Sequence, residues 1–294
     1  MNQTTIDKLA RQERIRREIL NKSDLIPTLP DLVVRVIELL NRGTTEPEEL
    51  ERHIQYDQVL VAKLLGMVNS PFYAVNRKIT TVSDAVMVLG FRGLRSLVLA
   101  SSTAQFMTRD FSLYGHTDKG LWLHALTTAT IARTLGRECR LGAAAAEELF
   151  IAGLLHDVGK MLVAPHLMEI GAPRMQPTDD VRARERDAIG IDHEEAGALV
   201  CAKWNLSQEL QSIIVSLDDE DTDPPSKDVA VVRIADQFAC ELGHGFEPGL
   251  APLPHYRASD FEVLGLNDKA WEEARERIEL NVEAAMSSLR DICG

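Results

Sequence analysis

Four side chains that can bind a metal ion interrupt otherwise apolar stretches of this sequence. They are His124 in GLWLHALTTATIA, the adjacent His156 and Asp157 in LFIAGLLHDVGK, and Asp236 in VAVVRIADQFAC. A buried carboxylate must be protonated, paired with a base or bound to a cation, because desolvating an unpaired charge is costly. Two imidazoles and two carboxylates around one divalent ion form a neutral site, and these ligands suit manganese, iron, magnesium or zinc. The four residues are therefore candidate metal ligands.

The same residues could also form a site without metal. Two carboxylates buried together repel each other unless one is protonated or a cation lies between them. Lys160 follows His156 by four residues and lies on the same side of the helix if that helix continues. Its ammonium group could pair with a carboxylate, leaving a polar cluster held by hydrogen bonds alone.

His193 is a weaker candidate for the same site. It follows Asp192 at an expected helix start, a position where aspartate commonly caps the helix. His193 could contribute a ligand, or it could be a surface residue beside that cap. The remaining histidines are expected to be exposed or in loops: His53, His116, His166, His244 and His255.

Helical periodicity dominates the segments that must position these residues. Apolar residues recur at three- and four-residue steps in DLVVRVIELL, the spacing of a helix with one buried face. No segment shows the alternation of a half-buried β-strand, so the sequence predicts an all-α protein. The segments TVSDAVMVLG and FRGLRSLVLASSTAQFM are expected to form two consecutive helices. Beyond residue 120 we expect helices around 121–137, 143–158, 193–204, 207–216, 228–242 and 268–289.

Local signals predict several helix ends and one boundary between domains. Gly43 is placed to end a helix. Thr45 and Glu48 form a capping box for the next helix, and Asp57 can cap the one after it. The polar stretch 108–120 is the best candidate boundary. It divides the chain into an N-terminal extension (1–24), an N-terminal helical bundle (25–110) and a larger helical domain (111–294).

The composition argues against several classes of protein. The 294 residues are 45% hydrophobic, which argues against intrinsic disorder. Lys and Arg number 32 against 45 Asp and Glu, and the resulting charge of −13 argues against binding to nucleic acid or to an anionic membrane surface. The four cysteines are widely spaced, and the sequence has no apolar run of the length that a signal peptide or membrane span needs. We therefore expect a soluble, cytoplasmic protein.

The candidate ligands, in this order and with the spelling LLHDVGK, resemble the signature of the HD superfamily of metal-dependent phosphohydrolases. In that superfamily a metal ion activates a water molecule and polarises a phosphate oxygen. The resemblance implies a phosphate contact for Lys160 and a metal ion held by His124, His156, Asp157 and Asp236.

Most of the chain resembles a narrower family. The stretches LPTLPDLVVRVIELL, NSPFYAVNRKITTVSDAVMVLGFRGLRSLVLASS and DHEEAGALVCAKWNLSQELQSII are similar to the HDOD family, the bacterial signalling relatives of HD and HD-GYP phosphodiesterases. The similarity covers roughly residues 25–240. It implies two helical subdomains and a role in signal transduction through protein contacts, without catalysis.

The sequence departs from the catalytic relatives at a second metal site. In HD-GYP enzymes a helix beginning like DHEEAG supplies a further histidine, which corresponds to His193, and the next helix ends in a His-His pair. Ser216 and Leu217 stand at the positions of that pair, and the GYP tripeptide is absent from the sequence. Because leucine cannot bind a metal, a two-metal site is disrupted, whereas a one-metal site could remain.

Two hypotheses about function follow. The first is a regulatory module that contacts signalling proteins and could hold a small phosphorylated ligand in the altered pocket. The second is a one-metal phosphohydrolase acting on a nucleotide or small phosphate ester. The missing His-His pair, and the lack of a second basic residue beside Lys160, favour the first hypothesis. The complete set of four candidate ligands favours the second.

Overall fold

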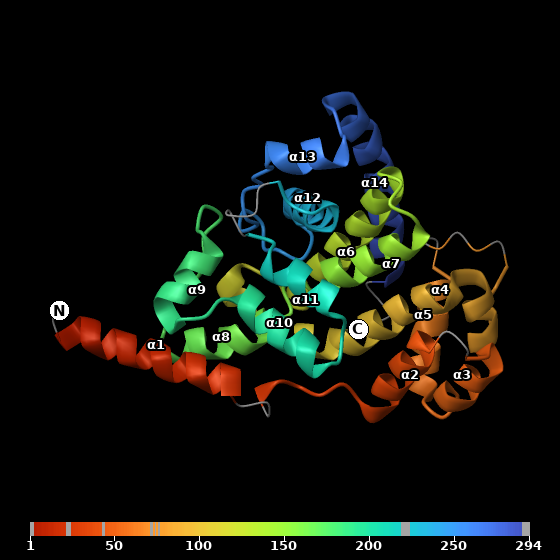
Figure 1. Cartoon of the computed structure of the whole chain (residues 1–294), viewed down its shortest axis with the longest axis horizontal. Helices are drawn as coiled ribbons and strands as arrows, with labels where there is room; N and C mark the ends of the chain where they lie inside the picture. The colour runs from red at the N-terminus through yellow and green to blue at the C-terminus, as the bar shows by residue number, and fades with distance from the viewer. Residues whose placement is uncertain are drawn as a thin grey trace.

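The structure is a computed structural model that describes residues 3–21, 25–42, 45–70, 73, 75, 77–218 and 224–289. It confirms the all-α prediction (Figure 1). Among these residues the only strand-like pairing is one isolated bridge between His116 and Phe246. The first helices are α1 (Gln3–Asn21), α2 (Asp31–Asn41), α3 (Pro47–Ile54), α4 (Gln58–Val68) and α5 (Val82–Met107). They are followed by α6 (Gly120–Glu138), α7 (Ala143–Leu155), α8 (Lys160–Glu169), α9 (Val181–Ile189), α10 (His193–Lys203), α11 (Gln208–Val215), α12 (Lys227–Leu242), α13 (Ala258–Leu264) and α14 (Asp268–Leu289).

The predicted caps of α3 and α4 have different outcomes. The carboxylate of Asp57 accepts a hydrogen bond from the backbone N–H of Leu60 at 2.9 Å and starts α4. The expected capping box at α3 is wrong, because the helix begins at Pro47 and the hydroxyl of Thr45 donates to the carbonyl of Leu39 at 2.6 Å instead. Gly43, the expected end of α2, lies outside the described residues.

The long helix α5 joins the two groups of helices. Helices α2, α3 and α4 pack against it, and its later turns contact α6 and α7. Gly90 interrupts its regular geometry with a φ of +71°, a conformation that glycine adopts without steric cost. The sequence predicts two consecutive helices here, and the kink divides α5 at the expected place. Helix α5 is long and apolar enough to span a membrane, but 61% of its apolar window is buried inside the protein.

Helix α6 is the centre of the second group. It packs against α7, α12 and α14, and almost every residue from Gly120 to Gly136 is buried. A helix that is apolar on all sides must be enclosed by other elements, and here α6 carries one candidate ligand, His124, into the core.

The segment predicted as a boundary contributes to this core. Residues 111 and 113–116 are buried, and a short 3-10 turn spans Ser112–Tyr114. The division of the chain into domains at this segment remains a prediction.

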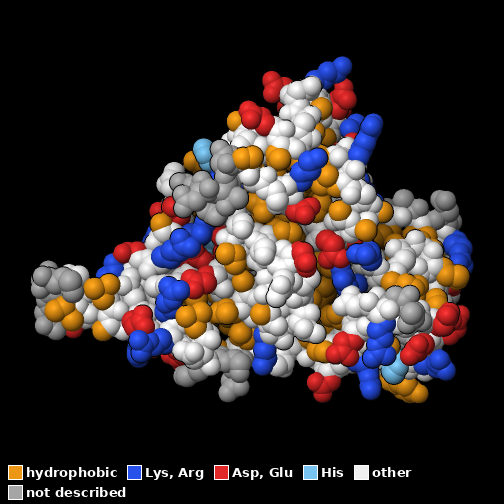
Figure 2. Space-filling view, in the orientation of Figure 1, with side chains coloured by type: hydrophobic (Ala, Val, Ile, Leu, Met, Phe, Trp, Pro, Cys, Tyr) orange, Lys and Arg blue, Asp and Glu red, His pale blue; other side chains and the backbone are white. Residues whose placement is uncertain are grey.

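The N-terminal helix lies along one edge of the molecule, where it packs against α9 and α10 (Figure 1). Its apolar side chains Ile15 and Ile19 are buried, and Arg16 donates to Glu195 of α10 at 2.6 Å. On the face shown in Figure 2, basic and acidic side chains are interspersed. Residues 219–223 of the acidic run 218–223 lie outside the described residues.

Candidate functional site

Three elements bring the predicted ligands together. His124 projects from α6, His156 and Asp157 lie in the turn between α7 and α8, and Asp236 projects from α12. Glycines allow the close approach that this requires. A Cβ atom on Gly153 would lie 2.9 Å from the backbone of Ala129 on α6, so only glycine lets α7 pack this tightly against α6.

The turn that carries Asp157 is held equally closely against α10. A Cβ atom on Gly159 would lie 1.9 Å from the carbonyl oxygen of His193 and 2.4 Å from the backbone nitrogen of Gly197. Any side chain at position 159 would therefore push α10 away. Gly159 of the HDVGK motif therefore sets the distance between Asp157 and His193, and the same motif supplies possible metal ligands.

The side chains of the four predicted ligands converge on one small volume. The Nε2 atoms of His124 and His156 lie 3.0 and 3.3 Å from Oδ1 of Asp236. Oδ2 of Asp157 lies 3.3 Å from Nε2 of His156 and 3.8 Å from Nε2 of His124. His124, His156 and Asp157 are buried, while the side chain of Asp236 is 27% exposed.

Three of the four residues meet the geometric requirement of a metal site most closely. The ligand atoms of His124, His156 and Asp236 lie within 4.8 Å of one another. Bonds of about 2.0–2.2 Å to one ion leave ligand atoms roughly 3 Å or slightly more apart, which matches the observed separations. The residues present therefore fit a single divalent ion, which would bind His124, His156 and Asp236.

Asp157 is engaged by the protein's own cations. The ammonium group of Lys160 donates to its Oδ2 atom at 2.6 Å, and Nε2 of His193 lies 3.5 Å from its Oδ1 atom. The same ammonium lies 5.0 Å from the centre of the Tyr114 ring, a distance at which the ring face attracts a cation. The pairing of Lys160 with a carboxylate that the metal-free alternative includes is therefore present.

Two residues that the sequence analysis missed complete this network. Nδ1 of His193 lies 2.7 Å from Oε2 of Glu185, and the hydroxyl of Tyr114 donates to Oε1 of Glu185 at 2.6 Å. Glu185 is fully buried, although it stands in the charged run VRARERD, which resembles a solvated helix face. No local signal distinguishes it, because its burial depends on α9 meeting α10 and Tyr114.

His193 is therefore part of the site, and the cap beside it is also present. Asp192 accepts a hydrogen bond from the backbone N–H of Glu195 at 2.9 Å and caps α10. His116, which was expected to be exposed or in a loop, lies outside the helices in the isolated bridge to Phe246 and is buried. Its ring stacks on Phe246 at 4.3 Å and lies 5.8 Å from the ring of His124.

The pKa values in the cluster follow from burial and neighbouring charges. Burial lowers the pKa of His156, but Asp157 and Asp236 outweigh it and raise the pKa to about 10. Burial raises the pKa of Asp157, but Lys160 and His156 hold it well below its usual range. Burial likewise raises the pKa of Asp236, and hydrogen bonds from His124 and His156 lower it overall. In the metal-free cluster His156 carries its proton at neutral pH, so an arriving metal ion must displace that proton.

Ser216 and Leu217, the two positions that the resemblance assigns to a second metal site, are held by hydrogen bonds to their backbone. Ser216 follows α11, and its backbone carbonyl accepts a hydrogen bond from Nη2 of Arg233 at 2.9 Å. Nε of Arg233 donates to the carbonyl of Leu217, whose side chain is buried. A guanidinium group from α12 thus fixes the backbone at the two positions where the related enzymes have histidines.

Comparison with known proteins identifies one family. A model of the HDOD domain matches residues 26–219. An uncharacterised protein of Treponema pallidum (strain Nichols) is 27% identical over 208 residues, which make up 68% of this chain and 39% of that protein. The chain therefore spans about two fifths of the length of this curated relative.

Solved structures share the fold. A provisionally named phosphohydrolase from Shewanella amazonensis SB2B has a TM-score of 0.68 and 24% identity, covering 92% of this chain and 97% of that one. A provisionally named signal transduction protein from Marinobacter aquaeolei VT8 has a TM-score of 0.71 and 20% identity, covering 97% of this chain and 66% of that one. These likenesses establish the arrangement of the helices, and the chemistry must be argued from the site residues.

Proposed function

The chain belongs to the HDOD domain family, and we propose that it is a regulatory module of bacterial signal transduction that acts through protein contacts and hydrolyses no substrate. The observation that carries this proposal is the engagement of Asp157 by Lys160. The resemblance to the HD superfamily implies that this aspartate is a metal ligand, and in this structure an internal ammonium lies 2.6 Å from its Oδ2 atom. A buried carboxylate compensated in this way needs no metal ion to remain charged.

The loss of the second metal position supports the same proposal. Hydrolysis of a phosphodiester by two metals requires ligands for both ions, which together stabilise the attacking and leaving oxygens. Ser216 and Leu217 replace two of those ligands, and Arg233 places a positive charge against their backbone. This guanidinium is itself paired with Asp260 at 3.3 Å, and it holds the backbone where no imidazole is present to bind a second metal ion.

Contacts with other signalling proteins are the proposed output, and a small phosphorylated ligand is a proposed input. The acidic net charge of −13 supports partners other than nucleic acid or an anionic membrane surface. We place this activity in the bacterial cytoplasm, as expected for a family of signalling modules. If the chain is a module of a longer protein, the signalling role of that protein belongs to the same proposal.

A hydrolysis assay tests the proposal. Purified protein is loaded with Mn²⁺ or Zn²⁺ and incubated with para-nitrophenyl phosphate and bis-para-nitrophenyl phosphate. We expect the wild-type protein to release no more nitrophenol than the His156→Ala variant. Metal-dependent turnover that is lost in His156→Ala but kept in a variant of the exposed histidine, His255→Ala, would refute a purely regulatory role.

A one-metal phosphohydrolase is the second candidate, and the arrangement of His124, His156 and Asp236 favours it. When bound, a divalent ion supplies a Lewis acid that polarises phosphate oxygens and lowers the pKa of water. The partly exposed Asp236 gives this group its contact with solvent. Lys160 could bind phosphate only by giving up part of its interaction with Asp157. The same assay therefore decides between the two candidates.

A further inference from the structure

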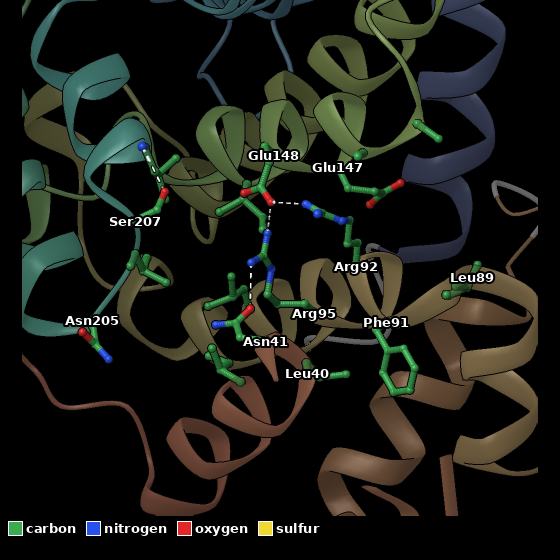
Figure 3. A pocket seen from close by; sticks show the side chains of 18 of the residues that line it. Leu40, Asn41, Leu89, Phe91, Arg92, Arg95, Glu147, Glu148, Asn205 and Ser207 are labelled. Carbon is green, nitrogen blue, oxygen red and sulfur yellow. Dashed lines mark hydrogen bonds and ion pairs between the residues drawn. The ribbon is translucent and has the colours of Figure 1, made fainter. Parts of the chain in front are cut away.

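A cleft of about 860 Å³ lies between the two groups of helices, away from the His–Asp cluster (Figure 3). One wall comes from α2 and from α5 around its kink at Gly90. The other comes from α7, the end of α6 and the start of α11. Small-molecule sites in proteins commonly have volumes of about 300–1,000 Å³ and lie between packed bodies.

Arginine side chains give this cleft a positive charge within an acidic protein. Arg92 and Arg95 line it from α5, and Arg137 lines it from α6. The facing carboxylates belong to Glu147 and Glu148 of α7, so the lining residues carry three positive and two negative charges. The side chains of Arg92 and Arg137 are 59% and 58% exposed, which leaves them accessible to a ligand.

The arginines of α5 are incompletely neutralised. Arg92 donates to Oε1 of Glu148 at 3.1 Å, and Arg95 donates to the same oxygen atom. Arg95 also donates to Oδ1 of Asn41 at 2.9 Å, as Figure 3 shows. The Nε atom of Arg95 is buried and has no hydrogen-bond partner among the described residues. One carboxylate oxygen thus serves two guanidinium groups, and a donor remains unused.

The N-terminus of α7 borders the same space. Ala143 and Ala144, the first residues of α7, line the cleft. The preceding residue, Gly142, makes no side-chain capping bond. The free N–H groups and the dipole at a helix N-terminus favour an anion, and the small side chains let a ligand approach them.

These observations lead us to propose that the cleft binds a small organic phosphate of nucleotide size. A phosphate monoester carries a charge of about −1.5 to −2 at neutral pH, so it can displace the single charge of Glu148 from Arg92 and Arg95. A ligand that carries only a carboxylate would replace the carboxylate of Glu148 with a group of the same charge, which gives no electrostatic advantage. The volume exceeds what phosphate alone would fill, and the apolar residues Leu40, Phe91 and Leu206 offer contact to the organic part.

Binding in the cleft would act on the contact between the two groups of helices. Arg92 and Arg95 belong to α5 and Glu148 belongs to α7, so a phosphate that binds these two arginines in place of Glu148 removes ion pairs between the two helices. This proposal is independent of metal binding or hydrolysis at the His–Asp cluster, because no residue of that cluster lines the cleft.

Calorimetric titration of the intact chain with ADP, pyrophosphate and adenosine tests the proposal. Low salt keeps the arginines available, and EDTA excludes a metal ion at the His–Asp cluster. We expect one ADP to bind with a dissociation constant below about 1 mM, pyrophosphate to bind more weakly, and adenosine to give no saturable signal. Failure of both phosphates to bind would overturn the proposal. Equal affinity for pyrophosphate and ADP would show that the cleft makes no contact with the organic group, which would contradict that half of the proposal. Saturable binding of adenosine would show that binding needs no phosphate, which would contradict the other half.

Three variants locate the binding to this cleft. Arg95→Gln should weaken ADP binding about tenfold or more, because it removes a charge-assisted hydrogen bond. The exposed Arg92→Gln should weaken it in the same direction, which guards against misfolding of the first variant. Glu148→Gln should instead tighten binding several-fold, because it removes the competing carboxylate.

Two matched controls separate a local effect from net charge. The variants Arg109→Gln and Glu272→Gln change exposed residues outside the cleft and should leave the affinity within about twofold of wild type. Wild-type affinity in both Arg92→Gln and Arg95→Gln would show that ADP binds elsewhere, and the proposal would then be wrong.

Discussion

The His–Asp cluster and the cleft between α5 and α7 both contain opposite charges in contact, but they differ in burial. Lys160 and Asp157 lie 2.6 Å apart with side chains that are 10% and 4% exposed. Arg92 and Glu148 lie 3.1 Å apart with side chains that are 59% and 37% exposed. Water cannot replace either partner in the first pair, whereas it can replace both partners in the second. The first pair therefore maintains the structure of its site, and the second is available for exchange with a ligand.

Removing the buried cation should have the largest effect on stability. Lys160→Met leaves Asp157 without its ammonium partner, and we expect a loss of about 3–5 kcal/mol in the free energy of unfolding. Denaturant titration in EDTA measures it, with the exposed Lys203→Met as the matched control. The double variant Lys160→Met/Asp157→Asn should recover part of the loss. A loss below about 1 kcal/mol for Lys160→Met would mean that the pair behaves like a surface ion pair.

Metal binding should distinguish the two aspartates of the cluster. We expect one equivalent of Mn²⁺ or Zn²⁺ to raise the free energy of unfolding by about 2–3 kcal/mol when its concentration is a hundred times the dissociation constant. Asp236→Asn should abolish the gain, whereas Asp157→Asn should retain it, because Asp157 is already engaged by Lys160. Elemental analysis of the dialysed proteins checks the stoichiometry. If neither ion binds the wild-type protein, the one-metal hydrolase is excluded.

Alkaline pH should lower the free energy of unfolding by weakening the buried network, with a smaller effect than Lys160→Met. Burial lowers the pKa of His193, but Glu185 and Asp157 outweigh burial and the opposing charge of Lys160, and they raise the pKa to about 9. The folded state therefore holds a proton that the unfolded state releases near pH 6.5, and stability falls as pH rises from there to about 9. Relative to His193→Gln, the wild-type protein in EDTA should lose about 2–3 kcal/mol over this range. Parallel pH profiles of the two proteins would contradict this assignment.

Breaking the exposed pair should have the smallest effect. Arg92→Gln should change the free energy of unfolding by less than about 1 kcal/mol, and the difference should shrink further at high salt. Denaturant titration at two salt concentrations checks both statements. A loss comparable to that of Lys160→Met would show that the cleft arginines hold the two groups of helices together and are not free to bind a ligand.

Much of the cluster could be predicted from sequence because its members interrupt apolar helices. His124, His156 and Asp236 stand among residues that must be buried, so their polarity is visible against the pattern. Glu185 and Tyr114 could not be found in this way. Glu185 stands among charged residues, and Tyr114 lies in a segment that the sequence analysis interpreted as a boundary between domains. Their roles depend on contacts between segments about 70 residues apart, such as the hydrogen bond between Tyr114 and Glu185.

The cleft could not be predicted because its residues come from distant parts of the chain. Asn41, Arg95 and Glu148 are unremarkable in their own helices, and only the packing of α2, α5 and α7 brings them together. The kink at Gly90 was anticipated as a division between two helices, but its position at the cleft was not.

The sequence by itself determined the all-α fold, the helix caps at Asp57 and Asp192 and the polar residues that meet at the His–Asp cluster, since these follow from periodicity, from capping preferences and from polar residues in apolar surroundings. The tertiary structure decided how those residues are compensated. It placed Lys160 beside Asp157, buried Glu185 beside His193, and left Arg92 and Arg95 to share one oxygen of Glu148. Electrostatic compensation depends on distance and burial, and both are set only when separate helices pack together.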